Sequence, residues 1–397
     1  MESFPHPNYI DLFAGCGGIS LGLYNAGWRG VFALEKSKMA FVTLKHNLID
    51  RAAHFDWPKW LPVSEHDIVD VLTRYSHELS SLKGSIDLVT GGPPCQGFSL
   101  AGRRDERDKR NSLADSYIKF VSLVKPSALF FENVRGFTFG FGKEDTRSEA
   151  YSNRVLKELQ ALGYLVKDEI VDSSEFGVPQ ARKRYILVGL LSGNSDDFFA
   201  KLHDIKGDFL RAKGLDVQVT LKEAISDLER RNGERISPEF RTFKEGIYGK
   251  TSSPYQELMR KGSVGFPDSH RFANHRKTTV KRFEYVLANC PKGKPLGDEI
   301  RAKFGLKKKT VIPLDEDGRC PTLTTLPDDY IHYSEPRILT VREYARIQSF
   351  SDCFEFKSNY TTGGGRRRIE VPRYTQVGNA VPPLFSELCG AVLRTVI

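Results

Sequence analysis

The chain has 397 residues, of which 40% are hydrophobic and 27% charged, the balance of a globular protein with room for two ordinary domains. No stretch approaches the roughly 18 uninterrupted apolar residues that a membrane span needs. The first seven residues contain neither the basic nor the apolar region of a secretory signal. These features exclude membrane-spanning and secreted classes and predict a cytoplasmic protein.

The six cysteines are scattered along the chain without a C-x-x-C pair, so the spacing of a zinc site or a disulfide framework is missing and no metal is expected. Lys and Arg exceed Asp and Glu by 59 to 50, a net charge of +9. Residues 271–310 hold twelve basic and three acidic residues. Such a segment suits a phosphate backbone, although a solvated lysine-rich surface would show the same excess.

From residue 9 to 189, short apolar runs alternate with stretches of helical length, the pattern of a parallel sheet covered by helices. The predicted strands are residues 9–14, 30–35, 86–90, 128–132, 164–171 and 185–190. The predicted helices are residues 19–26, 39–49, 113–124 and 154–162. The order predicts an α/β fold.

After residue 189 this rhythm is lost. Residues 191–336 are basic and rich in Gly and Pro, and residues 221–230 are the exception in being periodic. We therefore predict a second, less regular domain. Helical periodicity returns in residues 340–349 and 384–396.

A glycine-rich stretch, residues 11–18 (DLFAGCGG), lies where the first strand should turn into the first helix. Glycines there let a ligand approach the backbone, and the helix start offers unpaired N–H groups. A tightly packed turn would show the same residues. Glu35 ends the second strand about twenty residues on, where a ribose needs a hydrogen-bond acceptor. The spacing favours a nucleotide-like ligand.

A single cysteine, Cys95, follows the third strand in a loop that reads GGPPCQGFS. Two prolines and three glycines do not build a core, but they present a thiolate at the carboxyl end of a strand, where open α/β sheets bind ligands. Glu132 ends the next strand, so the two groups should lie at the same sheet edge. Gln180, Arg182 and Arg184 then alternate along an incoming strand, where each arginine can fork around an oxygen.

These four blocks, in this order, resemble the DNA (cytosine-5) methyltransferases. Residues 337–350 and 376–383 are similar to the family's ninth and tenth motifs, so the resemblance runs from Asp11 to Pro383. It implies an α/β, Rossmann-like S-adenosylmethionine-dependent methyltransferase domain with a smaller, irregular target-recognition domain. The implied division is residues 1–190 for catalysis and cofactor binding, 191–336 for DNA reading, and 337–397 returning to complete the catalytic domain.

The resemblance also implies a mechanism. The Cys95 thiolate adds to position 6 of a cytosine flipped out of duplex DNA, and position 5 then takes the methyl group. Glu132 acts at ring nitrogen N3, Arg184 binds the ring carbonyl oxygen, and Arg182 helps to hold the catalytic loop, so that these four residues form the catalytic set.

The remaining site residues follow from the same resemblance. S-adenosylmethionine would contact Phe13, Ala14, Gly15, Cys16, Gly17, Gly18, Glu35, Asp67 and Asn379. DNA would contact Gln96, Ser99, Arg103, Arg104, Gln180, Lys307, Lys308 and Lys309.

Three alternatives remain open. A dinucleotide-dependent oxidoreductase would share the first turn and Glu35, but it would not need the Cys95 loop. A non-catalytic DNA-binding relative would not need Cys95, Glu132 and Arg184 together. An RNA-methylating relative is the nearest runner-up, and the length of residues 191–336 favours a DNA reader. The architecture suggests a monomeric, cytoplasmic and nucleoid-associated modification enzyme paired with a bacterial restriction endonuclease.

Overall fold

The computed structural model describes residues 6–94, 113–139, 150–193, 195–362, 365–366 and 369–397. The chain forms two compact units. The first contains Met1–Asp172, Lys183–Lys206 and Phe385–Ile397, and the second contains Ser173–Arg182 and Gly207–Leu384.

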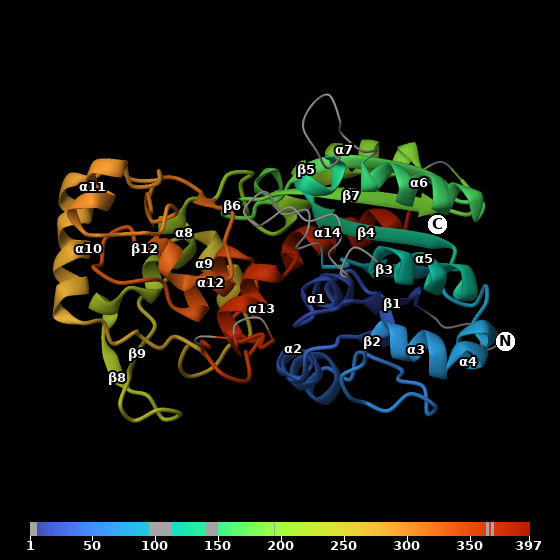
Figure 1. The fold of residues 1–397 in the computed structure, drawn as a ribbon, viewed down its shortest axis with the longest axis horizontal. Coiled ribbons are helices and arrows are strands. Elements are labelled where there is room, and N and C mark those ends of the chain that lie inside the picture. The colour runs from blue at the N-terminus through green and yellow to red at the C-terminus, as the bar shows by residue number, and fades with distance from the viewer. Residues whose placement is uncertain (1–5, 95–112, 140–149, 194, 363–364, 367–368) are drawn as a thin grey trace. The chain divides into compact units, whose positions relative to one another are not determined.

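A six-stranded sheet forms the centre of the first unit, in the order β2-β1-β3-β4-β7-β5 (Figure 1). Its strands are β1 Asn8–Leu12, β2 Arg29–Leu34, β3 Leu88–Gly91, β4 Ala128–Val134, β5 Leu165–Asp172 and β7 Lys183–Leu190. The six predicted strands are confirmed, and their ends lie within two residues of the predicted ones.

The sheet is mixed and not parallel throughout. β2, β1, β3 and β4 pair in parallel, whereas β7 runs antiparallel to both β4 and β5. The prediction of a parallel sheet is therefore wrong for β7. The reason is the connection: residues 173–182, which join β5 to β7, belong to the second unit, and no crossover helix turns the chain back into a parallel direction.

Helices cover both faces of the sheet because successive side chains of a strand point to opposite faces. Leu129 and Phe131 of β4 pack into the apolar core beneath one helical layer. Phe130 between them packs against Phe198 on the other face, with ring centroids 6.5 Å apart. The first layer is α3 Ile68–Arg74, α4 Ser76–Ser81, α5 Leu113–Val124 and α6 Tyr151–Ala161; the other includes α1 Gly18–Asn25 and parts of α7 Asp196–Ala212 and α14 Pro383–Leu393.

Several helices differ from their predictions. Residues 39–49 form α2, Lys38–Leu44, followed by a π-helical stretch, Lys45–Arg51, instead of one helix. The helices α3 and α4 were not predicted, because each shows too few turns for a clear period. α7 lies in the segment predicted to be irregular, with Gly207 interrupting its apolar pattern.

The second unit is built from short elements. Its helices are α8 Leu221–Ile225, α9 Pro254–Arg260, α10 Lys277–Asn289, α11 Asp298–Lys303, α12 Val341–Ile347 and α13 Arg373–Asn379. Its two-stranded pairs are β6 Gln180–Ala181 with β11 Cys320–Pro321, β8 Glu234–Ile236 with β9 Lys244–Gly246, and β10 Ile312–Pro313 with β12 Tyr330–Ile331. A second, irregular unit was expected, although α10, at 13 residues, is longer than the sequence suggested.

The boundary of the second unit differs from the predicted one. Residues 337–384 lie in the second unit, and only Phe385–Ile397 of the C-terminal segment lies in the first. The cause is visible in α12. Its Arg346 is fully buried against Asp227, and its Arg342 against Asp268, so the segment packs with residues 207–336.

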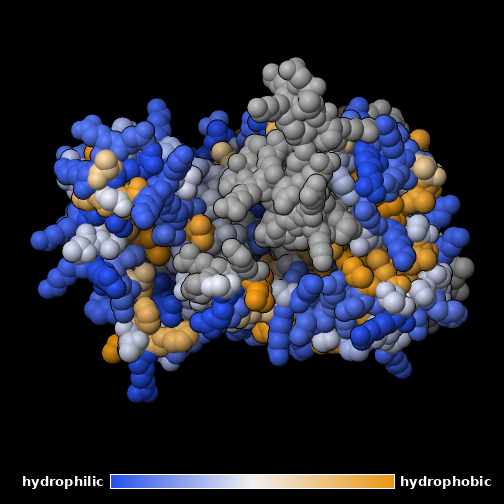
Figure 2. Space-filling model, viewed as in Figure 1, coloured by the Kyte–Doolittle hydropathy of each residue, from blue (hydrophilic) through white to orange (hydrophobic). Residues whose placement is uncertain are grey.

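On the face drawn in Figure 2, both units carry mainly hydrophilic residues with hydrophobic ones scattered among them. None of the helices in the described ranges is both long and apolar enough to cross a membrane.

Candidate active site

The glycine-rich turn between β1 and α1 has a backbone that favours glycine. Gly15 and Gly17 have φ of +58° and +96°, and Phe13 adopts φ +60°, which is uncommon for a residue with a side chain. Strained backbone of this kind gathers at ligand sites. A Cβ added at Gly15 would meet nothing within 4 Å, whereas one at Gly17 would lie 2.9 Å from Leu48. The turn is thus closed on the Gly17 side and open at Gly15.

Glu35, at the end of β2, holds this turn in place. Its Oε2 accepts a hydrogen bond from the Gly15 N–H at 2.9 Å, and its Oε1 accepts one from the Ser37 N–H at 2.6 Å. Burial raises the pKa of Glu35, and the two N–H donors oppose that shift. The structure therefore brings two separately predicted cofactor residues, Gly15 and Glu35, into direct contact.

Asp67 has other partners. It caps α3 by accepting from the Val69 N–H at 2.9 Å, and its Oδ2 lies 2.7 Å from Lys36 Nζ. Burial raises the pKa of Asp67, but Lys36 and the Val69 N–H outweigh it, so the pKa is lowered overall. The backbone bond from His66 N–H to the Glu35 carbonyl, 2.8 Å, keeps Asp67 close to the end of β2. Lys36 was not predicted, although its place directly after Glu35 was a signal.

The second predicted cluster lies at the ends of β4 and β7. Glu132 Oε1 is 2.9 Å from Arg184 Nε, and both side chains are about nine-tenths buried. Burial lowers the pKa of Arg184, and the charge of Glu132 opposes that shift. The antiparallel register that pairs Val134 with Arg184 and Glu132 with Ile186 places the two charges on one face of neighbouring strands.

The backbone that leads to Cys95 passes directly over this pair. A Cβ added at Gly92 would lie 2.9 Å from Glu132 Oε2, so only glycine fits there without a shift. The side-chain amide of Asn133 donates to the Pro93 carbonyl at 3.3 Å. Gly92 was missed as a site residue, although the double glycine at the end of β3 was its signal.

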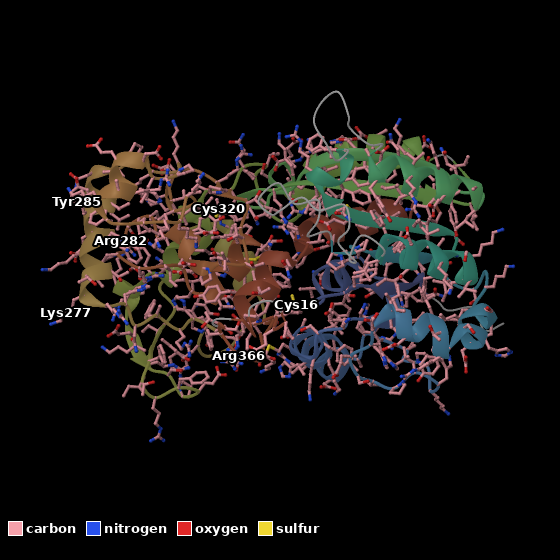
Figure 3. All side chains as sticks on the ribbon, in the orientation of Figure 1. Cys16, Lys277, Arg282, Tyr285, Cys320 and Arg366 are labelled. Atoms are coloured by element: carbon pink, nitrogen blue, oxygen red, sulfur yellow. The ribbon has the colours of Figure 1, made fainter. Side chains whose placement is uncertain are left out.

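Five predicted residues, Cys95, Gln96, Ser99, Arg103 and Arg104, lie outside the described residues. Three of the other cysteines are buried. Cys16, in the cofactor turn, is 1% exposed, and burial raises the pKa of its thiol to about 12 (Figure 3). Burial also raises the pKa values of Cys320 and Cys389. These three thiols stay protonated at neutral pH and are poor nucleophiles.

The two predicted arginines do not share a strand. β6 ends at Ala181 and β7 begins at Lys183, so Arg182 lies between them in the second unit and Arg184 lies in the first. The expectation of alternate arginines on one strand face is wrong for this reason. Arg182 is 1% exposed, and its Nη2 donates to the Gly378 carbonyl at 3.2 Å.

Gln180 and Asn379 also belong to the second unit. Gln180 is fully buried; its amide donates to Gln348 Oε1 and its carbonyl oxygen accepts from the Leu323 N–H, both at 2.8 Å. Asn379 is the exposed last residue of α13, and its carbonyl accepts from Arg182 at 3.5 Å.

The three predicted DNA-binding lysines differ from one another. Lys307 and Lys309 are exposed and have no ion-pair or hydrogen-bond partner among the described residues. Lys308 is held by acids instead, with Nζ 2.5 Å from Asp329 and 2.8 Å from Asp328. The same basic region includes α10, along which Lys277 and Arg282 lie (Figure 3).

A family model described as C-5 cytosine-specific DNA methylase matches residues 8–393. The chain belongs to this family. The predicted activity, DNA cytosine-5 methylation, is thereby confirmed, and so is the predicted Rossmann-like α/β fold class of this DNA methylase.

Individual relatives match the methylase over nearly its whole length. The Type II methyltransferase M.DdeI of Desulfomicrobium norvegicum is 32% identical, over 96% of this chain and 86% of that protein. The Type II methyltransferase M.XorII of Xanthomonas oryzae pv. oryzae is 29% identical, over 98% and 85%. Among solved structures, a prophage-encoded E. coli protein described as a DNA modification methyltransferase has a TM-score of 0.66 and 25% identity, over 98% and 99%.

Proposed function

We propose that this DNA methylase transfers a methyl group from S-adenosylmethionine to position 5 of a cytosine that is flipped out of a specific duplex DNA sequence. The observation that carries the proposal is the buried Glu132–Arg184 pair, 2.9 Å apart, directly beneath the Gly92 backbone that leads to Cys95. A carboxyl and a guanidinium fixed beneath the backbone of Gly92, three residues before the candidate nucleophile in the sequence, match the needs of an activated cytosine ring.

In the proposed reaction, Cys95 activates the cytosine ring before methyl transfer. The Cys95 thiolate forms a bond to C6, and the displaced electron pair enters the ring, where Glu132 supplies a proton to N3. Arg184, held by Glu132, donates to the ring carbonyl oxygen. C5 then attacks the donated methyl group. A base removes the C5 proton, the C6–sulfur bond breaks, the ring double bond re-forms, and Glu132 recovers its proton.

The residues of the first turn fit S-adenosylmethionine, which supplies the methyl group when bound. Glu35 Oε2 accepts from the Gly15 N–H and Oε1 from the Ser37 N–H, and a carboxylate, with about four lone pairs, retains acceptor capacity for a ribose hydroxyl. The open space at Gly15 leaves room for a ligand beside this turn. In the proposal Phe13, Ala14, Cys16, Gly17 and Gly18 complete the turn that contacts it. In the proposal Asp67 and Asn379 complete this cofactor set, with Asp67 retaining acceptor capacity beyond its bonds to Lys36 and Val69.

Gln180 and Arg182 act as positioning residues in this proposal, since both side chains are buried and bonded within the second unit. Gln96, Ser99, Arg103 and Arg104 are assigned to DNA contact from the sequence, and Lys307 and Lys309 have the exposure that a phosphate contact needs. Residues 191–336, most of which lie in the second unit, would read the target sequence. The enzyme would act as a monomer in the cytoplasm, on the nucleoid.

The biological role proposed is protection of host DNA from a partner restriction endonuclease. It is supported by the name Type II methyltransferase that M.DdeI and M.XorII bear.

The test is bisulfite sequencing of plasmid DNA from cells that express the protein, with a tRNA fraction from the same cells treated in parallel. The expected result is methylcytosine at one short motif in the plasmid. Cys95→Ala should abolish it, and Cys290→Ala, which removes a partly exposed thiol of the second unit, should not. Methylation confined to tRNA, or undiminished in Cys95→Ala, would contradict the proposal.

A further inference from the structure

Arg271 is held in place by the backbone on both sides. Residues 270–272 lie along β9: the Gly246 N–H donates to the His270 carbonyl at 3.1 Å, and the Phe272 N–H donates to the Lys244 carbonyl at 2.9 Å. His270 and Phe272 are buried. Since side chains alternate along an extended chain, Arg271 points to the opposite face.

The side of residues 270–272 that faces the protein interior is tightly packed. The two His270 ring nitrogens lie 2.8 Å from Thr340 Oγ1 and from the Leu228 carbonyl. A Cβ added at Gly246 would lie 2.4 Å from the His270 ring, so the strands approach as closely as glycine allows. The Cα of Arg271 is therefore fixed.

Aromatic rings fix the guanidinium as well. Its central carbon lies 3.7 Å from the ring centroid of Tyr360, 4.1 Å from that of Phe243 and 4.8 Å from that of Phe240. Stacking of this kind attracts the cation but uses none of its five N–H donors. Because the Arg271 side chain is already ordered in the folded protein, its rotamer entropy is not lost again when it binds a ligand.

A second arginine on the same ring shows the contrast. Arg373 lies 4.2 Å from the Tyr360 centroid, and all its nitrogens are used. They donate to the Ser358 carbonyl at 2.8 Å, Ser269 Oγ at 3.0 Å and Glu239 Oε1 at 2.5 Å. Among the described residues, Arg271 has no hydrogen bond or ion pair from its guanidinium. The charge of Glu239, which accepts from Arg373, acts on Arg271 without a direct ion pair. Arg271 is thus a partly buried charge on a rigid frame, and none of its donors is used by another described residue.

We propose that Arg271 reads a guanine in the target DNA, donating in a fork to O6 and N7 of the base edge. The proposal rests on the proposed function. A planar fork matches the two guanine acceptors in the major groove, and this pair is the commonest specific contact between proteins and DNA. A phosphate contact requires charge but little rigidity, and exposed lysines such as Lys307 and Lys309 already supply that.

The test uses the methylated motif once bisulfite sequencing has defined it. Each base pair of the motif is replaced in turn, and kcat/KM for methyl transfer is measured for the wild type, Arg271→Gln, Arg271→Lys and the control Arg276→Gln. Arg276 is an exposed arginine of the same basic segment. A further set of duplexes carries 7-deazaguanine, which lacks the N7 acceptor, at one guanine of the motif at a time.

At one base pair, Arg271→Gln should lower the preference for guanine by roughly 5- to 150-fold and leave the other positions unchanged. The wild type should lose activity with 7-deazaguanine at that pair, whereas Arg271→Gln should not. Arg271→Lys keeps the charge and should lose the same preference. Arg276→Gln should lower kcat/KM for all sequences by one common factor.

A uniform loss in Arg271→Gln would show a phosphate contact and overturn the proposal, and so would an unchanged sequence profile. If Arg271→Gln does not fold, as judged by its Tm, the Arg271→Lys profile decides. If the wild type methylates no duplex at all, the proposed function fails, and that result is distinct from a wild type that methylates DNA while the variants keep its profile.

Discussion

The two units differ in what fills their interiors. The core of the first is mainly apolar, with Leu129 and Phe131 of the central strand β4 fully buried among other hydrophobic side chains, although Asp11 and His54 are buried in this unit too. The core of the second contains fully buried arginines. Arg346 donates to both oxygens of Asp352, at 2.6 Å each, and to both oxygens of Asp227, at 3.1 Å each.

The contrast follows from secondary structure. A sheet satisfies its own backbone and needs only apolar side chains between the layers. The short elements of the second unit leave many polar groups to be satisfied, and buried arginines reach them: Arg346 also donates to the Ala224 carbonyl, and Arg342 to those of Asp268 and Phe354. We infer that the stability of the second unit depends on buried ion pairs more than the stability of the first unit does.

The largest expected effect is catalytic. Glu132→Gln should lower the single-turnover rate of methyl transfer by about 10²- to 10⁴-fold, because the proton for N3 is lost. Glu132→Gln also leaves the nearly buried Arg184 without its charged partner, so the free energy of unfolding should fall, and the rate is measured where circular dichroism shows the variant folded. The Kd for DNA should stay close to that of the wild type. Near-normal turnover would show that the acid lies elsewhere.

The next effect is on stability. Burial raises the pKa of Asp352, but Arg346 and Arg342 outweigh it and hold the pKa below its usual value. Asp352→Asn leaves Arg346 partly uncompensated and should cost about 3–5 kcal/mol in the second unit. Leu129→Ala should cost about 2–5 kcal/mol in the first.

Urea titration separates these two variants. All three tryptophans, Trp28, Trp57 and Trp60, lie in the first unit. Leu129→Ala should shift the transition seen by tryptophan fluorescence, and Asp352→Asn should shift mainly the transition seen by circular dichroism. Equal shifts by both probes in both variants would refute the difference between the two interiors.

The difference between the two interiors also decides which contacts could be predicted from the sequence. The contact between Glu35 and Gly15 was predictable, because periodic strands place their carboxyl ends at one sheet edge. The pairing of Arg346 with Asp227, 119 positions apart, could not be predicted, because no periodic pattern in the sequence connects the two residues. The separation of Arg182 from Arg184 was also hidden, because nothing in Gln-x-Arg-x-Arg marks the point where the backbone leaves the sheet.

A smaller effect is expected on the stability of the second unit at acidic pH. Burial lowers the pKa of His270 to about 3 and that of His332 well below its usual value, so both are neutral in the folded second unit. The unfolded chain binds a proton at each below about pH 6.5, so stability is present above that pH and falls as pH drops, by about 1.4 kcal/mol per pH unit for each histidine.

In the first unit, the effects of two buried groups on the pH dependence of stability cancel. Burial lowers the pKa of His54 to about 3 and raises that of Asp11 to about 7. The proton that unfolding adds at His54 is matched by the one it releases from Asp11. Burial also raises the pKa values of Asp227 and Glu229, and the protons that these carboxyls bind in the folded state oppose the loss in the second unit.

Between pH 6.5 and 5.5 the urea midpoint by circular dichroism should therefore fall, while the midpoint by tryptophan fluorescence should hold. Equal falls in the two midpoints would show that the buried histidines do not make the second unit more sensitive to acid than the first.

The smallest effect concerns the lysines. Neutralising Lys307 or Lys309 to Gln should lower the salt slope of DNA binding by roughly 0.9 each if each contacts a phosphate. Lys308→Gln should leave the slope nearly unchanged, since Asp329 and Asp328 already neutralise its charge. Three equal slopes would contradict the difference in their partners.

The most direct measurement of the central claim is covalent trapping. A duplex carrying the methylated motif with 5-fluorocytosine at the target should take the methyl group but then stop, because fluorine cannot leave as the proton does. The account predicts a complex that survives denaturation, with the mass of the protein plus the methylated target strand, in the wild type and not in Cys95→Ala. A wild type that methylates the unmodified duplex yet forms no such complex would contradict it.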